Sequence, residues 1–559
     1  MASSLKEKLA KLRLNPQPGR SSLAKSLLLG GVPHTPELER ILRLPRRSSS
    51  EPFPPSLSSE LSHHIFAPSS PERGLRPVQA ESFHTIDVMR GMLGMIGVGE
   101  GKTLISQISP FILDLYPALL MVPGGLVKKT KVEFDWWAET FRIRIRPPSI
   151  LSYQLLSHPK HQQDLLKLRP RLIVLDEAHH AANPFSALST RLAEYLEAFP
   201  ETVVIAMSGT LIERSLLDIH HLLQWTLGPD ASPLPRTREE CAVWAQALDH
   251  EVPFGSRRAK GALKVFDEGG GFGVYLRNTL GVVVGGSTDV GASIRYRVLS
   301  FDLGADIKRH LAAADDGVRP DGEVEFEAAA LSSLKFTLSL GFWLRWKEPG
   351  PPLWMEKRRR WGQFVRWTLE QRLPNLDSEE MVRQAYGDST QEGKEWFAIE
   401  PSFVPETEVV WLDRSIIPAV IEKSKLRYPL IWCAHPACAS LLNPYFGAGG
   451  KDLHTGRSIL DVTKPVTAGL SIEANIEGKN LQHLWHENLL LDIPKSASTL
   501  EQLIARTHRP GQRKDEVVVT FYAPTAAHRE RIAFVKQQAQ WLEQFKGKKQ
   551  KLQIGDWEI

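Results

Sequence analysis

The segment GVGEGKT at 97–103 combines three glycines with a lysine and a threonine. Glycines let backbone N–H groups curl around phosphate oxygens, the lysine can reach the β and γ phosphates of a nucleotide, and the threonine hydroxyl can ligate magnesium. The strict phosphate-loop pattern has a further glycine at position 96, where this chain has Ile96. The segment predicts a nucleotide site, whose expected residues are Gly97, Gly99, Gly101, Lys102 and Thr103.

Two adjacent carboxylates, Asp176 and Glu177, follow the apolar run LIVL. A buried strand that ends in an acidic pair fits magnesium coordination by the first carboxylate and polarisation of an attacking water by the second. Acids at strand ends also serve as helix caps, so the pair alone does not indicate a magnesium site. Together with the phosphate segment that precedes it in the chain, it does. The hydroxyls of SGT at 208–210 are placed either to bond this pair or to form a simple turn. We expect ATP and Mg2+ as cofactors, with Thr103 and Asp176 as metal ligands.

A basic segment, QLIARTHRPGQ, occupies 502–512. Arg506 and Arg509 are three residues apart on what we predict to be a helix and its end, so both can face one side. Guanidinium groups supplied from a second domain stabilise charge on the γ-phosphate, and in other systems contribute roughly 10³- to 10⁵-fold in rate. A solvated basic helix end is the alternative. The expected catalytic residues are Lys102, Asp176, Glu177, Arg506 and Arg509.

Short apolar runs alternate with helical stretches in two parts of the chain. Each run in the first part ends at a loop with polar or glycine residues. Buried strands followed by helices form a doubly wound parallel sheet, which binds ligands at the carboxyl ends of its strands. We therefore predict an α/β fold with two such lobes. The runs are 118–123, 172–176 and 203–207 in the first part, and 430–433, 488–492 and 516–522 in the second.

The length of 559 residues exceeds one compact core, so we expect several domains. A Ser-, Pro-, Leu- and Arg-rich N-terminal arm, with one short helix at 5–14, fits either an interaction arm for a protein partner or plain disorder. The lysine-rich stretch 546–551 is expected to be a solvated end. The predicted domains are the weakly ordered arm at 1–70, a first ATPase lobe at 71–290, a mainly helical insertion at 291–420, a second lobe at 421–535 and a basic tail at 536–559.

The composition argues against a membrane protein, a disulfide-rich protein and a four-cysteine zinc protein. Hydrophobic content is 42% and charged content 24%, and no apolar run approaches the roughly 20 residues that cross a bilayer, so we expect no membrane partner. The net charge of +5 allows a local basic groove without diagnosing one. Cys241, Cys433 and Cys438 are too few for a disulfide framework or a four-cysteine zinc site, and we expect them to be buried in a reducing compartment.

In this order, the motifs resemble those of helicase superfamily two ATPases, and most closely the Swi/Snf-type branch of DNA translocases. The DEAH box of that family matches 176–179 fully. Its QAxxRxHRxGQ element, which separates this branch from others, resembles 502–512 very closely. Its DEMGLGKT element corresponds to 96–103, without the leading acids. The resemblance covers about 74–285 and 425–525, and it implies two RecA-like lobes.

Other elements extend the resemblance. LRPVQ at 75–79 resembles the LRPYQ-like element that contacts adenine, which implies Gln79 as a nucleotide contact, and Gln502 is implied as another. The sequence SGTLI resembles the TGTP element, and GKNLQ at 478–482 resembles GLNLQ. The family block before GLNLQ is hard to align with 465–477.

The resemblance implies that 122–130 and 152–155 line a DNA path in the first lobe. Between 341 and 372, five tryptophans are interleaved with basic residues, a combination that can bind phosphates and stack on unpaired bases. The alternative is an amphipathic helix whose tryptophans are buried while its arginines are solvated. The expected DNA-binding residues are Pro123, Lys128, Lys129, Lys357, Arg358, Arg359, Arg360 and Asn480.

We expect an ATP-dependent motor that tracks along double-stranded DNA and remodels DNA or protein–DNA complexes. A strand-separating helicase of replication, recombination or repair, with single-stranded DNA as a partner, is the first alternative. A DNA-binding assembly protein with a decayed ATPase is the second, and the intact set of catalytic residues argues against it. No chromatin-reading module is recognisable, so we expect a compact bacterial or viral member. It would act in the cytoplasm of a bacterial or virus-infected cell, or in the nucleus if eukaryotic.

Overall fold

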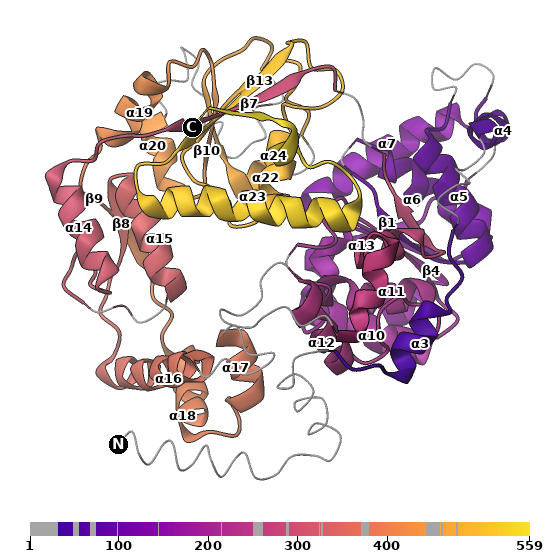
Figure 1. Ribbon diagram of the computed structural model, residues 1–559, viewed down its shortest axis with the longest axis horizontal. Coiled ribbons are helices and arrows are strands. Elements are labelled where there is room, and N and C mark those ends of the chain that lie inside the picture. Colours follow the sequence, from indigo (N-terminus) through magenta and orange to yellow (C-terminus); the bar gives the residue numbers. More distant parts are fainter. Residues whose placement is uncertain are drawn as a thin grey trace. The chain divides into compact units, whose positions relative to one another are not determined.

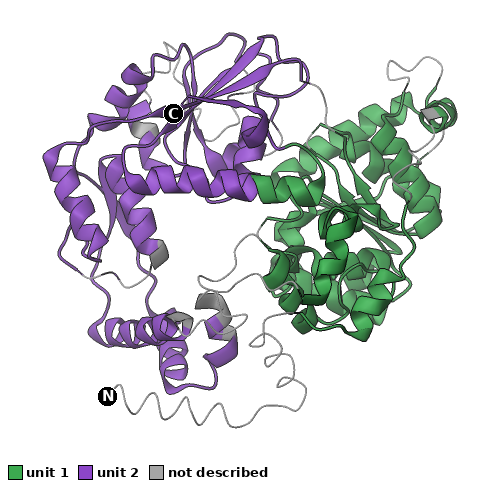
Figure 2. Ribbon diagram, in the orientation of Figure 1, with its two compact units in different colours: residues 1–287, 540–549 green, residues 288–539, 550–559 purple. Residues whose placement is uncertain are grey.

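In the computed structural model, the chain forms two compact units (Figure 2). The first contains residues 1–287 and 540–549, and the second contains 288–539 and 550–559. The helix predicted at 5–14 lies outside the described residues. Each unit has one six-stranded parallel sheet, so the predicted α/β fold with two parallel-sheet lobes is confirmed. The structure describes residues 32–558, except 48–54, 68–73, 98, 143–144, 162, 214, 250–260, 287–289, 324, 326–327, 371–378, 443–458, 460–461 and 477–478.

The first sheet is built from the short apolar runs of the first unit. Its strands are β1 (Met92–Met95), β2 (Ala118–Val122), β3 (Ser149–Ser152), β4 (Leu172–Asp176), β5 (Val203–Met207) and β6 (Val282–Val284). They lie in the order β3-β2-β4-β5-β1-β6, with every neighbouring pair parallel. β1 and β2 are buried along their whole length, as expected for a parallel sheet covered by helices on both faces.

Helices connect these strands, because parallel neighbours need a crossover between them. α5 (Pro77–Met89) and α6 (Lys102–Leu113) lie on one side of β1 and β4, and α11 (Leu217–Leu227) lies on the other (Figure 1). The remaining helices of this unit are α7 (Val127–Thr140), α8 (Tyr153–Ser157), α9 (Asp164–Leu168), α10 (Ala187–Ala198), α12 (Arg238–Leu248) and α13 (Phe272–Asn278). Single 3-10 turns are η1 (Gly124–Leu126), η2 (Pro159–His161), η3 (Ala178–Ala181) and η4 (Gly261–Gly269).

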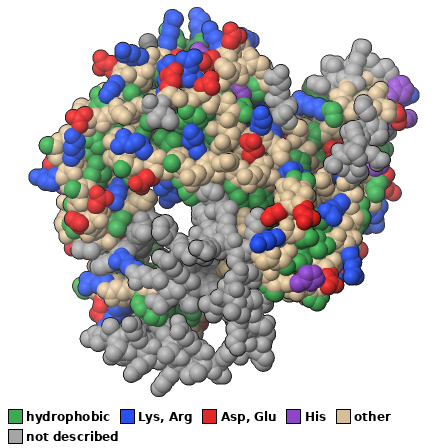
Figure 3. All heavy atoms as spheres, in the orientation of Figure 1, with side chains coloured by type: hydrophobic (Ala, Val, Ile, Leu, Met, Phe, Trp, Pro, Cys, Tyr) green, Lys and Arg blue, Asp and Glu red, His purple; other side chains and the backbone are tan. Residues whose placement is uncertain are grey.

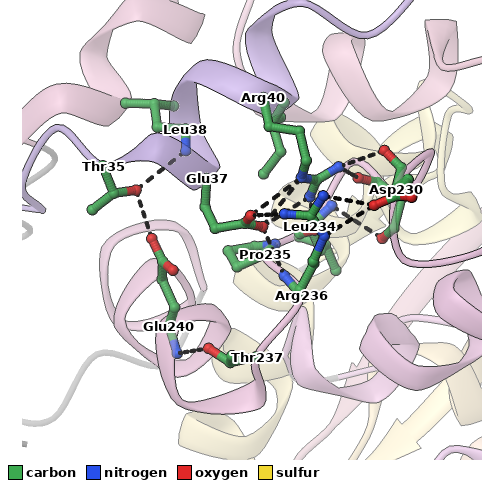
Figure 4. Close-up of polar contacts among 12 residues, drawn as sticks. Thr35, Glu37, Leu38, Arg40, Asp230, Leu234, Pro235, Arg236, Thr237 and Glu240 are labelled. Carbon is green, nitrogen blue, oxygen red and sulfur yellow. Dashed lines mark hydrogen bonds and ion pairs between the residues drawn. The ribbon is translucent and has the colours of Figure 1, made fainter. Parts of the chain in front are cut away.

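The helix α3 (Pro36–Leu42) is held on the first unit by polar contacts of Thr35, Glu37 and Arg40 (Figure 4). Arg40 Nη1 donates to the carbonyls of Asp230 at 2.7 Å and Ser232 at 3.0 Å, and Nη2 donates to the carbonyl of Leu234 at 2.9 Å. The two apolar side chains on the inner face of α3 are buried. This segment therefore differs from the predicted weakly ordered arm, because its arginine and its apolar face both find partners.

A second part of the predicted arm also belongs to the core. α4 (Pro55–Ile65) ends at Ile65, and this residue and Phe66 are buried in the same hydrophobic cluster as β1, β2 and β4. Phe66 packs against Trp137 and Phe141, with ring centroids 6.0 and 6.1 Å apart. The described residues 55–67 are thus part of the first unit.

Three strands of the second sheet, at 293–299, 468–471 and 556–558, were not among the predicted apolar runs. Its strands are β7 (Ser293–Leu299), β10 (Leu430–Cys433), β11 (Ala468–Ser471), β12 (Glu487–Leu490), β13 (Glu516–Tyr522) and β14 (Asp556–Glu558), in the order β11-β10-β12-β13-β7-β14 and parallel throughout. β7 was predicted to be part of a helical insertion. Its apolar pattern is broken by Arg295 and Arg297, which pair with Glu516 and Glu558 on the neighbouring strands.

The insertion carries an antiparallel pair and a helical module. β8 (Phe342–Trp346) pairs with β9 (Thr407–Trp411), and the helices are α14 (Ala305–Asp315), α15 (Ala328–Ser339), α16 (Pro352–Glu370), α17 (Glu379–Tyr386) and α18 (Gln391–Ile399), with η5 (Glu400–Ser402). Trp354 packs edge-on against Trp396 at 4.9 Å, and Trp361 packs against Phe397 at 5.1 Å. Trp354 and Trp361 are buried. These tryptophans are core residues of the module, so they are not available to stack on bases.

The C-terminal segment is folded, contrary to the predicted solvated tail. The last helices of the chain are α19 (Ile416–Ser424), α20 (Ala437–Leu442), α21 (Ile472–Asn475), α22 (Ala497–Ile504), α23 (Ala526–Lys546) and α24 (Lys551–Ile554). Lys546 is only 7% exposed, and its Nζ donates to the carbonyl of Gly209 at 3.0 Å. The aliphatic stem of Lys546 is buried against the protein and its ammonium binds a carbonyl, so this lysine is not solvated.

The surface shows no strong segregation of charge on the face drawn in Figure 3, where basic and acidic side chains are interspersed. Within the described part of the chain, no helix is long and apolar enough to cross a membrane. The cysteines are free and buried, as predicted.

Replacing Arg40 with alanine should release α3 from the first unit. The substitution leaves three backbone carbonyls without their charged donor, so we expect the local stability of α3 to fall by about 2 kcal/mol. Hydrogen exchange of the 36–42 peptide measures this change. Arg43 follows the same helix with 81% of its side chain exposed. Its replacement should change the stability by no more than about 0.5 kcal/mol. Equal exchange in the two variants would contradict the assigned role of Arg40.

Candidate functional site

The candidate site lies at the carboxyl ends of β4, β5 and β1, which are three consecutive strands of the first sheet. The loop 96–101 follows β1, the turn 208–210 follows β5, and Asp176 ends β4. Ligands of doubly wound sheets bind at this edge. The structure therefore brings together the glycine loop, the acidic pair and the hydroxyl-bearing turn, although about seventy residues separate the loop from the pair and about thirty separate the pair from the turn.

The glycine loop adopts a backbone conformation that few other residues take readily. Gly99 and Gly101 lie in the left-handed region, with φ of 83° and 90°. A Cβ at Gly101 would overlap the amide of Gln79, whose Nε2 donates to the Gly101 carbonyl at 3.4 Å. Gln79 Oε1 accepts a hydrogen bond from the backbone N–H of Arg76 at 2.8 Å. The buried Gln79 thus holds the loop against the start of α5, while its predicted contact with adenine stays a prediction.

The loop leads directly into α6, whose N-terminus is open to an anion. Gly101 is the N-cap of this helix, and no described side chain caps it. The first amides of a helix lack intrahelical acceptors, and the helix dipole adds partial positive charge there. Lys102 and Thr103 are the first two residues of α6. A phosphate group is the ligand that such a terminus binds most often.

Lys102 is a buried ammonium held by oxygens. Its Nζ lies 2.6 Å from Glu177 Oε1 and donates to the carbonyl of Ile96 at 3.4 Å. Burial by itself would lower the pKa of Lys102, but the carboxylates of Glu177 and Asp176 outweigh that cost and raise the pKa above its usual value. The ammonium is therefore charged, and it already holds one anionic oxygen.

Asp176 and Glu177 respond to burial in opposite ways. Burial raises the pKa of Asp176 to about 7, although the Lys102 ammonium opposes the shift. Burial also acts to raise the pKa of Glu177, but Lys102 and His179 hold it well below its usual value. Glu177 has a φ of 56°, which is uncommon for a residue with a side chain. This left-handed turn directs Glu177 back toward Lys102 while Asp176 completes β4.

The hydroxyl turn after β5 is tied to the acidic pair through a histidine. Ser208 Oγ donates to Glu177 Oε2 at 3.1 Å and lies 2.9 Å from His179 Nδ1. Thr210 Oγ1 lies 3.2 Å from the same ring nitrogen. Tyr153, at the start of α8, donates its hydroxyl to the carbonyl of Asp176 at 2.7 Å. His179 and Tyr153 are site residues that the sequence-based set omitted. The DEAH spacing could have indicated His179, while no local signal indicated Tyr153.

These residues fit the phosphates of a nucleotide and a magnesium ion. The open helix terminus and the Lys102 ammonium would hold phosphate oxygens. The ammonium already contacts an anionic oxygen in this structure, that of the Glu177 carboxylate. Burial and the neighbouring Glu177 carboxylate raise the pKa of Asp176, and a divalent cation bound beside it would favour its ionised form. Asp176 and the Thr103 hydroxyl offer the oxygen ligands that Mg2+ prefers. Among the described residues, no group of three or more His, Cys, Asp and Glu side chains could hold a metal by itself.

In the second unit, the two predicted arginines have different environments. The predicted helix is shorter than expected, because α22 ends at Ile504. Arg506 is 3% exposed, and its guanidinium donates to the carbonyls of Gln502 at 3.2 Å and Lys479 at 3.1 Å. The helix therefore does not reach Arg506 or Arg509, and the expectation that both side chains face one side stays a prediction. Arg506 fastens the turn after α22 to the GKNLQ segment.

Arg509 keeps a partly exposed side chain. Its Nη1 donates to Asn480 Oδ1 at 2.5 Å, so the structure joins these two predicted site residues. Asn480 is exposed, and Gln502 is partly buried on α22. The neighbouring His508 is buried, with Nε2 2.7 Å from the carbonyl of Ala292. The assigned contacts of Arg509, Asn480 and Gln502 with nucleotide or DNA stay predictions.

The predicted DNA-binding residues of the first unit lie near a common surface. Lys128 and Lys129 are exposed in the first turn of α7, while Pro123 is buried before η1. The backbone N–H of Gly124 donates to Gln154 Oε1 at 2.9 Å, so the two predicted DNA-path segments are adjacent. Lys128 and Lys129 are the charged candidates for phosphate contact, and Lys129 is the weaker of the two because its Nζ lies 3.6 Å from Glu133 Oε1.

The basic run of α16 is largely paired with acids of its own module. Lys357 Nζ lies 2.7 Å from Glu395 Oε2, Arg358 lies 3.8 Å from Glu325, and Arg360 lies 2.9 Å from Glu356. Arg359 is exposed. A paired cation releases less free energy on binding a phosphate than an unpaired one, so this run is a weaker DNA candidate than the sequence alone indicates.

No protein-family model matches the chain, and no curated protein matches it. Among solved structures, the chain is similar to the SWI2/SNF2 ATPase core of Sulfolobus solfataricus in complex with dsDNA. The identity is 15%, the match covers 86% of this chain and 90% of that chain, and the TM-score is 0.31. A TM-score this low leaves the fold assignment to rest on the strand order and register of the two sheets.

Asp176→Asn should change how the stability of the first unit depends on pH. The native pKa of about 7 exceeds the ordinary value of 3.8, so between these values the folded state keeps a proton that the unfolded state has lost. Stability should therefore fall as pH rises from about 4 to about 7 and level off above. Lys102, Glu177 and Glu133 are the charged groups that act on this carboxyl. The asparagine variant should lose this component of the slope.

Urea unfolding at pH 5 and pH 8, without nucleotide or Mg2+, measures the effect. Cys241 is fully buried in the first unit, so its labelling by a dipyridyl disulfide reports unfolding of that unit. Glu194→Gln, at an exposed position on α10, should keep the wild-type slope. An unchanged slope in Asp176→Asn would exclude the raised pKa.

Proposed function

We propose that the protein is a DNA-stimulated ATPase of the Swi/Snf-like type, which tracks along double-stranded DNA. The observation that carries the proposal is the 2.6 Å contact between Lys102 of the glycine loop and Glu177 of the acidic pair. Two motifs separated in sequence thereby form one buried constellation at the ligand-binding edge of a parallel sheet. The order of the motifs along the chain, with the segment 502–512 in the second unit, supports the Swi/Snf-like assignment.

Each residue of the constellation has a distinct proposed role. Lys102 and the amides at the start of α6 bind and orient the β and γ phosphates. Bound Mg2+ supplies positive charge to the phosphates, with Asp176 and Thr103 as its protein ligands. Glu177, kept ionised by its neighbours, orients and polarises the attacking water once a phosphate takes its place on Lys102. Ser208 and His179 contact the Glu177 carboxylate, and they would keep it in place when it leaves Lys102 and polarises the water.

Further proposed roles belong to residues outside this constellation. Arg509 of the second unit is the better candidate for stabilising the charge that develops on the γ-phosphate during turnover. The guanidinium of Arg506 already donates to two backbone carbonyls. Lys128 and Lys129 are proposed contacts to the phosphate backbone of duplex DNA. Phosphate contacts carry little sequence information, which suits a motor that moves along DNA.

Double-stranded DNA should stimulate ATP turnover more than single-stranded DNA does. The stimulation should fall steeply with salt, because contacts to phosphates release counterions. The protein should also displace the third strand of a triplex, which reports tracking, without separating a forked duplex. Steady-state ATPase assays with both kinds of DNA and a strand-displacement assay measure these outcomes. Fork unwinding with ATPase stimulated mainly by single strands would favour a helicase instead.

Two variants of the first unit serve as controls for that assay. Lys102→Ala should abolish turnover, because it removes the ammonium that holds the phosphates. Glu177→Gln should retain ATP binding while losing turnover, because it removes the base and leaves the phosphate contacts. Full turnover in either variant would exclude the assigned site.

Arg509→Ala should lower DNA-stimulated turnover by about 10³-fold with little change in ATP affinity, because the guanidinium acts mainly on transition-state charge. Arg513 lies four residues further on and is exposed, so Arg513→Ala should retain wild-type turnover. Separate measurement of kcat and of the ATP dissociation constant checks the prediction. A loss of affinity equal to the loss of rate would instead indicate a ground-state phosphate contact.

A further inference from the structure

The glycine loop carries a buried acid that the proposed reaction does not use. Glu100 is 2% exposed, and its Oε2 accepts a hydrogen bond from the backbone N–H of Gly97, at the other end of the loop. Its carboxylate occupies a niche that two glycines leave open. A Cβ at Gly285, just after β6, would overlap this carboxylate, and a Cβ at Gly97 would approach it to 2.9 Å.

A lysine from the far end of the chain neutralises this acid. Lys548 Nζ lies 3.0 Å from Glu100 Oε1, with side-chain exposures of 27% and 3%. Lys548 follows α23, whose last turn belongs to the first unit. Arg277 Nη1 donates to the carbonyls of Gln544 at 2.6 Å and Phe545 at 2.7 Å, which fixes this part of the chain.

The same turn of the chain also holds the second loop of the site. Lys546 Nζ donates to the carbonyl of Gly209 at 3.0 Å. The turn containing Gly209 packs closely on the glycine loop, because a Cβ there would lie 3.3 Å from Gly97 Cα. Two lysines of one short segment therefore contact both loops at the ligand-binding edge of the sheet.

We propose that Lys548 is a positioning residue of the nucleotide site, which acts through the carboxylate of Glu100. Without Lys548, Glu100 is a buried anion on the loop that binds the phosphates. It would oppose a second negative charge there, and it would also leave its niche to reach water. With Lys548, the pair is neutral and Glu100 holds Gly97 in place. This role rests on the proposed function, since it concerns the same site.

The test is a double-substitution cycle in the full-length chain. Lys548→Met should weaken binding of a fluorescent ATP analogue by about tenfold, a typical coupling for residues in contact. It should also speed hydrogen exchange of the 97–103 peptide in the nucleotide-free protein. Glu100→Gln combined with Lys548→Met should bind the analogue more tightly than Lys548→Met alone, because no unpaired charge remains. Lys548→Arg should retain near-wild-type affinity.

The exposed Lys549 provides a matched control, because Lys549→Met removes the same charge from the next position. It should leave both the affinity and the exchange unchanged. Additive effects of the two substitutions, or equal effects of Lys548→Met and Lys549→Met, would overturn the proposal.

The two readouts separate this proposal from the proposed function. If the wild-type protein binds ATP and hydrolyses it while Lys548→Met has no effect on affinity or exchange, the positioning role fails and the function stands. If the wild-type protein binds no ATP, the proposed function fails, and with it the role of Lys548 in nucleotide binding. The hydrogen exchange of the 97–103 peptide then still decides whether the Glu100 pair holds the loop.

Discussion

A buried ammonium shared between two carboxylates is the constraint on which the site depends. An isolated charge in the interior costs several kcal/mol, so Lys102 can be buried only if an anion reaches it. Glu177 meets this need at 2.6 Å, and its ionised form is stabilised in return. Burial raises the pKa of the neighbouring Asp176 to about 7, although the Lys102 ammonium opposes the shift.

The fold satisfies this constraint through strand order. β5 lies between β4 and β1, so the turn after β5 stands between the acidic pair and the glycine loop. Ser208 of that turn hydrogen-bonds Glu177, and Gly209 approaches the backbone of Gly97. Two left-handed residues, Gly101 and Glu177, bring the ends of β1 and β4 to the same point. A one-strand change in order would separate these groups by about 5 Å per strand.

The sequence predicted the parts of the structure that are encoded locally. β4, β5, β10 and β13 were predicted with their observed bounds, because each is a continuous apolar run buried on both faces. β7 was missed because Arg295 and Arg297 interrupt its pattern, and their acidic partners lie more than two hundred residues away. Such pairings cannot be inferred from a local window.

The candidate site was likewise predicted where its residues are close together in the sequence, and missed where they depend on tertiary contacts. The glycine loop and the acidic pair were recognisable from residue type and spacing, and the structure brings Lys102 and Glu177 into contact. The burial of the Arg506 guanidinium was not predicted, because its hydrogen bond to the carbonyl of Lys479 is a tertiary contact. The contact of Lys548 with Glu100 was also beyond reach, since the lysine-rich stretch has the composition of a solvated end.

The placement of β7 has a consequence for how the chain is made. β7 pairs on one side with β13 and on the other with β14, and both strands follow it by more than two hundred residues in the chain. The first unit likewise receives 540–549 late, although its sheet is complete by Val284. In a nascent chain the edges of β7 therefore stay unpaired until these two strands have been synthesised, and unpaired strand edges of this kind promote aggregation. Productive pairing of β7 must therefore wait until β13 has been synthesised, and β7 needs protection from aggregation during that interval.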